Sequence, residues 1–379
     1  MNWLVARSVV VLAVLGAVVL AAESKRTRTL FDRFDKDGDG KLSESELTAP
    51  RLFKRFDADA DGVLTAKELS TLGERRALRG RSESALVNQV VEHQMTLDGR
   101  ERSYFVFTPS TLSERSPVVF VFHGGGGKAR GFARRRGLNE FAEKEGFLVV
   151  YPQGYGGNWN DGREAPAINA QREKVDDVKF VRSIVAELAK SHPIDRSRIY
   201  ATGISNGGIF SHYLAANASD LFAAIAPIIG GLAEPVADDF SPSHPISVLI
   251  IQGDSDGLVP IDGGAVGGRL LARRGRVIST DETIKKYLEA NDIDGEPTVT
   301  TIEESQPDDG TTTEVRRYPL GNDDVRVEVY VVKNGGHTIP GTDPPALLGR
   351  IVGKTSRDFD AWEVVWDFFK KVPPRKQAD

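Results

Sequence analysis

The stretch Ile199-Tyr-Ala-Thr-Gly-Ile-Ser-Asn-Gly-Gly208 decides the fold of this chain. A short β-branched and apolar run leads into Gly203-Ile-Ser-Asn-Gly207, and a helical pattern follows it. Small residues around Ser205 allow the sharp strand-to-helix turn that presents a nucleophilic hydroxyl. The pentapeptide alone is a weak signal, because a glycine-rich turn with a serine that has no catalytic role can have the same sequence pattern. The strand–turn–helix context therefore carries the prediction of a nucleophile.

From residue 91 onward, short apolar runs alternate with amphipathic helical patterns. The predicted strands are 104–107, 118–122, 147–151, 199–201, 248–251 and 327–332. Helical periodicity covers 178–188 and 362–369, and Ser279 with Glu282 predicts a capping box at the start of a further helix. Strands that alternate with helices predict a mainly parallel sheet covered on both faces. We expect an α/β domain over residues 91–373.

Two residues downstream of Ser205 complete a candidate catalytic triad. In α/β-hydrolases the chain order is serine, acid, histidine. His337 follows the predicted strand 327–332 and is the one histidine beyond the acid region, so we expect it to be the base. Asp254 and Asp256 compete for the acid, directly after strand 248–251. We expect Asp256 to orient the imidazole, and Asp254 to bond to backbone within its turn.

A glycine run, His123-Gly-Gly-Gly-Gly127, follows the predicted strand 118–122. It is of the type whose backbone N–H helps to bind an oxyanion, and the second donor is the N–H of the residue after the serine, here Asn206. The alternative, a phosphate-binding loop, lacks the Lys-Ser/Thr that such a loop needs.

Residues 27–72 form a different unit, predicted to be a small all-α pair of EF-hands. Both 35–46 and 57–68 satisfy D-x-D-x-D-G-x₅-E, which supplies the oxygen ligands of a Ca²⁺ loop with glycine at its sixth position. The predicted ligands are Asp35, Asp37, Asp39, the Lys41 carbonyl, Ser43 and Glu46, then Asp57, Asp59, Asp61, the Val63 carbonyl, Thr65 and Glu68. Leu42 and Leu64 take the positions that pair the loops. The short spacing favours a structural or docking module over a switch.

The first 22 residues are typical of a signal peptide. Arg7 supplies the positive charge, 9–20 is almost wholly apolar, and cleavage is expected after Ala21 or Ala22. The alternative, an uncleaved anchor, is disfavoured because the run is short for a membrane span. We therefore expect a secreted or periplasmic protein with no stable membrane span after cleavage. Residues 73–90 are expected to be a polar linker.

Composition excludes several classes of function. The 379 residues carry a net charge of −5, which argues against a nucleic-acid partner. The sequence has no cysteine, which excludes disulfides, thiolate metal sites and a cysteine nucleophile.

Several motifs in order resemble the secreted polyhydroxybutyrate depolymerase and feruloyl esterase family, an α/β-hydrolase group of the carbohydrate esterase family 1 type. The matching stretches are 123–124, 150–154, 158–162, 175–178, 203–208, 256 with 259–260, 335–337 with 340–341, and 366–369. The resemblance implies Ser205 as nucleophile, His337 as base, Asp256 as acid and the Gly125 N–H as first oxyanion donor. The sequence departs from the family at Gln252, where relatives usually have His, and at Ile339, where they usually have Trp.

The sequence thus predicts an exported serine esterase with two structural Ca²⁺ sites and no cofactor for its chemistry. The expected substrates are hydroxybutyrate oligomers or feruloyl or acetyl esters of polysaccharide. Two alternatives remain open: a calcium-dependent docking protein with an inactive hydrolase domain, and a serine peptidase. Trp159 is expected either to line the substrate pocket or to pack in the core.

Overall fold

The computed structural model describes residues 35–43, 45–46, 61–65, 89–134, 137–268, 274–302, 309–342 and 352–376. Two compact units divide the chain, Met1–Ala85 and Leu86–Asp379. The predicted signal peptide and residues 73–88 of the predicted linker lie outside the described residues. Within the ranges that are described, no helix combines the length and the apolar character needed to cross a bilayer.

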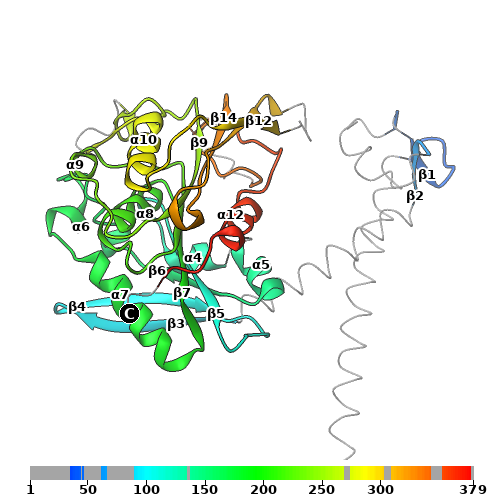
Figure 1. Ribbon diagram of the computed structural model, residues 1–379. Coiled ribbons are helices and arrows are strands. Elements are labelled where there is room, and N and C mark those ends of the chain that lie inside the picture. Colours follow the sequence, from blue (N-terminus) through cyan, green and yellow to red (C-terminus); the bar gives the residue numbers. More distant parts are fainter. Residues whose placement is uncertain are drawn as a thin grey trace, which may run out of the picture. The chain divides into compact units, whose positions relative to one another are not determined.

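A ten-stranded sheet forms the centre of the second unit (Figure 1). Its strands are β3 (Val90–Leu97), β4 (Arg100–Phe107), β5 (Ser116–Phe122), β6 (Leu148–Pro152), β7 (Ile194–Ile204), β8 (Ala224–Ile228), β9 (Ser247–Gly253), β12 (Thr298–Ile302), β13 (Thr312–Arg317) and β14 (Val327–Lys333). They lie in the order β12-β13-β14-β9-β8-β7-β5-β6-β4-β3. The strands from β14 to β6 run parallel, and the two strands at either end pair antiparallel. The predicted α/β-hydrolase architecture is confirmed.

Helices cover both faces of this sheet, as the alternation of patterns predicts. They are α4 (Ala129–Ala133), α5 (Leu138–Glu145), α6 (Asn169–Arg172), α7 (Asp177–Ser191), α8 (Asn206–Asn217), α9 (Glu234–Asp238), α10 (Thr280–Ala290) and α12 (Ala361–Lys371). One buried core joins the sheet to α7, α8 and α10, and a second joins its other face to α4, α5 and α12 (Figure 1). The Ser279–Glu282 capping box is present at the start of α10.

All six predicted strands form, and β3, β8, β12 and β13 were not predicted. Strand β8 reads Ala-Ile-Ala-Pro-Ile and is fully buried, although alanine and proline are poor strand formers. Its place between β7 and β9 imposes the extended conformation. At the edges, β3 and β12 carry mainly exposed or half-exposed side chains, so hydrophobic periodicity gives them little signal.

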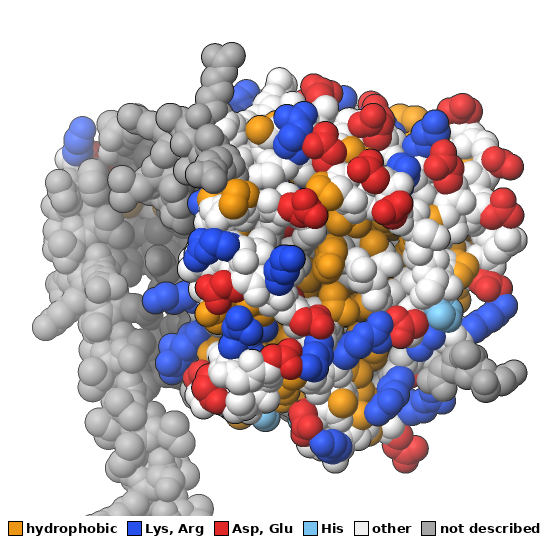
Figure 2. Space-filling model, turned by 90° about the vertical axis from the view of Figure 1, so that its left-hand side faces the viewer, with side chains coloured by type: hydrophobic (Ala, Val, Ile, Leu, Met, Phe, Trp, Pro, Cys, Tyr) orange, Lys and Arg blue, Asp and Glu red, His pale blue; other side chains and the backbone are white. Residues whose placement is uncertain are grey.

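Charged side chains of both signs intermix over the face of the molecule shown in Figure 2, with hydrophobic side chains between them. No extended field of one sign covers that face, in line with the modest net charge of −5.

In the first unit, the described residues form a short antiparallel ladder between β1 (Lys41–Ser43) and β2 (Val63–Thr65). Leu42 lies opposite Leu64, and both side chains are buried. The predicted pairing of the two loops through these leucines is confirmed.

Helix α12 provides a test of the second core. The Phe369 side chain is fully buried, and its ring stacks on Tyr200 of β7 with centroids 4.6 Å apart. We expect Phe369→Ala to lower the free energy of unfolding by about 3–5 kcal/mol, because it removes a large buried side chain and leaves a cavity. Urea titration followed by circular dichroism measures it. Leu320→Ala is the control: this side chain is 50% exposed, and its loss should stay within about 0.5 kcal/mol. Equal effects for the two variants would contradict the assigned core.

Candidate active site and calcium loops

Ser205 lies at the turn between β7 and α8 with an unusual backbone conformation, φ 54° and ψ −118°. A non-glycine residue at positive φ is uncommon and is stabilised only by its surroundings. Here the flanking glycines allow the close approach. A Cβ on Gly203 would lie 2.5 Å from the Gly207 oxygen, and a Cβ on Gly207 would lie 2.2 Å from the Phe122 oxygen. The small residues of the motif are therefore required by sterics, and they hold Ser205 half-buried at the start of the helix.

His337 and Asp256 are joined by a hydrogen bond of 2.7 Å between Nδ1 and Oδ2. The histidine side chain is 11% exposed, whereas the carboxylate is fully buried. The other carboxylate oxygen of Asp256 accepts from the N–H groups of Leu258 and Val259, at 2.8 and 2.9 Å. These two backbone donors fix the carboxylate, which in turn fixes the imidazole ring. The bond at Nδ1 leaves Nε2 as the ring nitrogen that can exchange a proton with a substrate or a nucleophile.

The structure brings Asp256, and not Asp254, to the histidine. Asp254 is exposed, and its Oδ1 accepts from the Asn334 N–H at 2.7 Å and from the Ser255 hydroxyl at 3.2 Å. It thereby ties the turn after β9 to the turn after β14, which is the backbone-bonding part expected of it.

Gln252 is a contributor to this site that the sequence reasoning did not assign. The side chain is buried and donates from Nε2 to Asp256 Oδ2 at 3.3 Å and to the Val259 carbonyl at 2.7 Å. A histidine at this position would also have a ring nitrogen to donate. The only sequence signal was this departure from the family pattern. Ile339, the other departure, is half-buried against the second core.

Topology gathers the predicted residues at one edge of the sheet. His123 follows β5, Ser205 follows β7, Asp256 follows β9, and His337 follows β14. These four strands run parallel, so their carboxyl ends lie at the same edge, which is where open α/β sheets carry their sites.

His123 holds the glycine loop in place. The buried ring lies between the Gly124 carbonyl, 2.8 Å from Nδ1, and the Gly154 N–H, which donates to Nε2 at 3.0 Å. Burial lowers the pKa of His123 below its ordinary value, so the ring is neutral with its proton on Nδ1. Both nitrogens are engaged, so His123 serves the loop conformation rather than proton transfer.

The predicted oxyanion donors lie side by side. In the loop, the N–H groups of Gly126 and Gly127 donate to Gly157 and Gly124. The Gly125 N–H has no partner within the described part of the chain. A Cβ on Gly125 would lie 3.7 Å from the Cβ of Asn206. Asn206 is the first residue of α8, where backbone N–H groups lack an intrahelical acceptor. The two unpaired N–H groups thus belong to Gly125 and Asn206, which lie next to each other in space, and Asn206 directly follows Ser205.

Two other motif residues have structural positions. Trp159 is fully buried and stacks on Phe210 with centroids 5.1 Å apart, so its expected alternative of packing in the core is the one observed. His212, on α8, is fully buried between the Tyr287 hydroxyl and the Gly230 carbonyl. Burial lowers the pKa of His212 to about 3, which keeps it neutral and unsuited to proton exchange.

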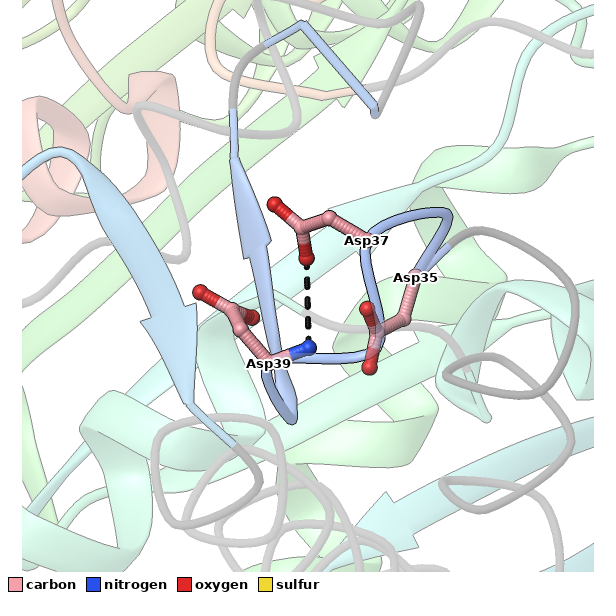
Figure 3. A group of neighbouring side chains, drawn as sticks. All are labelled: Asp35, Asp37 and Asp39. Carbon is pink, nitrogen blue, oxygen red and sulfur yellow. Dashed lines mark hydrogen bonds between the residues drawn. The ribbon is translucent and has the colours of Figure 1, made fainter.

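Three carboxylates lie close together in the first predicted EF-hand loop, as Figure 3 shows. Oxygens of Asp35, Asp37 and Asp39 lie within 4.8 Å of one another. Gly40 has φ +78°, the left-handed conformation that the turn at the sixth position of such a loop needs. Glu46 accepts from the Ser43 N–H and hydroxyl and from the Lys36 N–H, and these bonds lower its pKa to about 2. An ionised carboxylate therefore closes the loop, and this all-oxygen donor set fits Ca²⁺.

The second loop is described only from Asp61 to Thr65. Gly62 has φ +83°, which matches Gly40 of the first loop, and Val63 and Thr65 lie on β2. The predicted ligands Asp57, Asp59 and Glu68 lie outside the described residues.

Comparison with known proteins gives matches for both units. Residues 103–266 match the dienelactone hydrolase family, and 27–49 and 51–72 each match the EF-hand family. NocK of Nocardia uniformis subsp. tsuyamanensis, which is named as an esterase, is 32% identical over 73% of this chain and 81% of NocK. Feruloyl esterase B of Piromyces equi is 28% identical over 62% of this chain and 42% of that protein. Poly(3-hydroxyalkanoate) depolymerase C of Paucimonas lemoignei is 31% identical over 34% of this chain and 31% of that protein.

The chain thus spans less than half of the last two relatives. Among solved structures, an acetyl xylan esterase from Aspergillus awamori matches with a TM-score of 0.48 at 16% identity, over 66% of this chain and 95% of that one. The predicted resemblance to feruloyl esterases and polyhydroxybutyrate depolymerases is confirmed by the named relatives. The similarity to NocK extends over most of both proteins, and the strand order is that of an α/β-hydrolase. The chain belongs to the dienelactone hydrolase family of carboxylic ester hydrolases, with an EF-hand pair before the hydrolase domain.

Proposed function

We propose that this protein hydrolyses carboxylic esters through an acyl-enzyme formed on Ser205. The observation that carries the proposal is the bond between His337 Nδ1 and the buried Asp256 carboxylate, 2.7 Å long, at the sheet edge where Ser205 takes its strained turn. An exposed or loosely held histidine would not supply an oriented base, whereas this one is fixed by a carboxylate that two backbone N–H groups hold.

The proposed steps give each of these groups the role that it has in the general serine-hydrolase mechanism. Ser205 Oγ attacks the ester carbonyl carbon while its proton passes to His337 Nε2, and the carbonyl π electrons move to oxygen. The N–H groups of Gly125 and Asn206 donate to that oxyanion. When the intermediate collapses, the alcohol leaves with the proton from Nε2, and Ser205 keeps the acyl group. Water then repeats the sequence and releases the carboxylic acid. Asp256 remains ionised and stabilises the imidazolium. No cofactor takes part.

For the substrate, we propose soluble esters related to those in the names of the relatives: feruloyl or acetyl esters of polysaccharide, or hydroxyalkanoate oligomers. Hydrolysis of 4-nitrophenyl acetate and butyrate, methyl ferulate, acetylated xylan and hydroxybutyrate oligomers would test the proposal and rank the acyl groups. A serine peptidase would instead turn over peptides faster than esters. A docking protein with an inactive domain would fail to label Ser205 with a serine-directed fluorophosphonate.

For the EF-hand pair, we propose two structural Ca²⁺ sites. Asp35, Asp37, Asp39, the Lys41 carbonyl, Ser43 and Glu46 would hold one ion, and Asp57, Asp59, Asp61, the Val63 carbonyl, Thr65 and Glu68 the other. Bound Ca²⁺ would neutralise carboxylates that repel one another. We also propose export to the periplasm or beyond, on the strength of the apolar run at 9–20 after Arg7.

The triad can be tested by substitution. We expect Ser205→Ala and His337→Ala each to lower kcat for 4-nitrophenyl acetate by about 10³-fold or more, because triad members act as a unit. Asp256→Asn should also be severe, since it leaves the imidazole in the wrong tautomer. Steady-state kinetics on protein shown to be folded by circular dichroism measures these losses.

Asp254→Asn is the matched control for the acid. Its carboxylate bonds to the Asn334 N–H and does not reach His337, so kcat should fall by less than about threefold. If Asp254→Asn proved more damaging than Asp256→Asn, the assignment of the acid would be wrong.

Calcium should stabilise the first unit without entering the chemistry. The predicted ligands lie between Asp35 and Glu68, whereas the catalytic groups begin at Gly125. We expect the full chain to bind two ions by isothermal titration calorimetry, at roughly 10⁻⁴–10⁻³ M for an extracellular module. Glu46→Gln should leave one. Chelation should expose residues 27–72 to protease, because ligand-linked stability is lost.

Hydrolysis of 4-nitrophenyl acetate should meanwhile change by less than about twofold, well below the ~1.4 kcal/mol of a tenfold effect. A large, calcium-dependent loss of hydrolysis would mean that the EF-hand pair affects the active site, and would overturn the proposed structural role.

A further inference from the structure

A buried ion pair lies behind the candidate oxyanion site. Its two residues belong neither to the proposed triad nor to the proposed oxyanion donors. Asp161 and Arg163 are separated by one residue, and their side chains are 0% and 2% exposed. Arg163 Nη2 lies 2.8 Å from Asp161 Oδ2, and its Nε lies 3.0 Å from both carboxylate oxygens. Burying such a pair takes two charges out of water, and their attraction offsets this cost only when the geometry is good and further hydrogen bonds satisfy both groups.

Asp161 also accepts hydrogen bonds from two side-chain amides, one of which belongs to Asn206. The Asn206 Nδ2 amide donates to Asp161 Oδ2 at 2.5 Å, and Gln171 Nε2 donates to Oδ1 at 2.7 Å. Each carboxylate oxygen therefore accepts from a side-chain amide as well as from Arg163. An amide in place of the carboxylate could satisfy only one of these two neighbours, because its own NH₂ group would face the NH₂ of the other.

The other end of the Asn206 side chain is also held. Its Oδ1 accepts from the backbone N–H of Trp159 at 3.0 Å. The Trp159 indole N–H in turn donates to the His123 carbonyl at 2.9 Å, at the start of the glycine loop. Trp159 thus bonds to both segments that carry the proposed oxyanion donors: the loop that contains Gly125 and the first residue of α8.

These bonds fix a backbone group through its side chain. The Asn206 N–H belongs to the peptide that follows Ser205, whose φ of 54° is unfavourable for a side-chain-bearing residue. A relaxation of that turn would rotate this peptide and misdirect its N–H. With Oδ1 and Nδ2 both anchored, the Cβ and Cα of Asn206 cannot follow such a relaxation.

We infer that Asp161, with its charge balanced by Arg163, is a positioning residue for the oxyanion site and acts through the Asn206 side chain. This inference rests on the proposed function, since it presumes that the Asn206 N–H receives the oxyanion. The segment 158–161 thereby has a role in the reaction although its tryptophan is closed to substrate.

The test compares Asp161→Asn, Asn206→Ala and the double variant in the full chain, with 4-nitrophenyl acetate as substrate. Loss of an entire oxyanion donor costs about 10²–10³ in kcat, so a misdirected donor should cost about 10–100-fold. KM should change by less than about threefold, because the interaction forms in the transition state. The double variant should lose no more than the larger single effect, since both substitutions break the same link.

Inhibition by phenylboronic acid supplies a second readout. The serine adduct of a boronic acid is a tetrahedral anion, so its Ki should rise in parallel with the loss of kcat/KM. Asp195→Asn is the matched control. Asp195 is a buried carboxylate paired with Arg198 at the beginning of β7, at the opposite end of the strand from Ser205. This substitution should lower the melting temperature, yet leave kcat within about twofold.

Unchanged kcat in folded Asp161→Asn, or losses that multiply in the double variant, would overturn the inference. If Asp161→Asn does not fold, Asn206→Ala is the decisive variant, because it keeps the backbone N–H and removes only the side chain that Asp161 and Trp159 hold. An unchanged kcat in Asn206→Ala would also overturn the inference. Ester hydrolysis by the unaltered chain, with none by Ser205→Ala, must hold in the same assay. If the unaltered chain does not hydrolyse the ester, the proposed function is overturned, and this inference with it.

Discussion

The close approach of the start of α8 to the end of β5 is the constraint on which the rest of the site depends. A single Cβ on Gly207 would come within 2.2 Å of the Phe122 carbonyl oxygen, a distance that no side chain can meet without moving the strand. Because the helix begins so near the strand, Asn206 lies beside Gly125, and Ser205 is forced into positive φ at the same point. The geometry of the turn follows from backbone packing, and the proposed chemistry would use the N–H groups that this packing leaves unpaired.

Much of this arrangement could be predicted from the sequence, and the successes have a common origin. Buried parallel strands read as continuous apolar runs, and the glycines around Ser205 are required by local sterics, so both leave a direct mark on the sequence. The choice of Asp256 over Asp254 rested on a turn preference, and the bond to His337 is in line with it. Strands β3 and β12 leave a weaker mark, because their side chains are all exposed or half-exposed and form no continuous apolar run.

The polar brace around Asn206 could not be predicted in the same way, because its partners come from separate parts of the chain. Asp161, Gln171 and Asn206 are distant in sequence or lie on different elements, and nothing local shows that their side chains meet. The motif at 158–162 resembles the family pattern, but the sequence alone does not show what its residues do. The contacts of these residues supply a reason: Trp159 links the glycine loop to α8, and the Asp161 carboxylate accepts from the Asn206 side-chain amide.

Stability alone does not explain why such a pair is retained in the interior. Removing one partner of a buried ion pair costs about 3–5 kcal/mol, but a well-packed apolar substitute for both is often neutral or stabilising. The fully buried Asp161 and Arg163 are therefore a poor choice for a core that only has to pack. An apolar pair would, however, leave the Asn206 amide without an acceptor and the peptide after Ser205 free to relax. The role of the ion pair is better understood from the hydrogen bond that Asp161 accepts from Asn206 than from a contribution to folding stability. The pair supplies a fixed, charged acceptor in a place where water cannot compete. That is the property required to hold a strained turn in one conformation throughout a reaction.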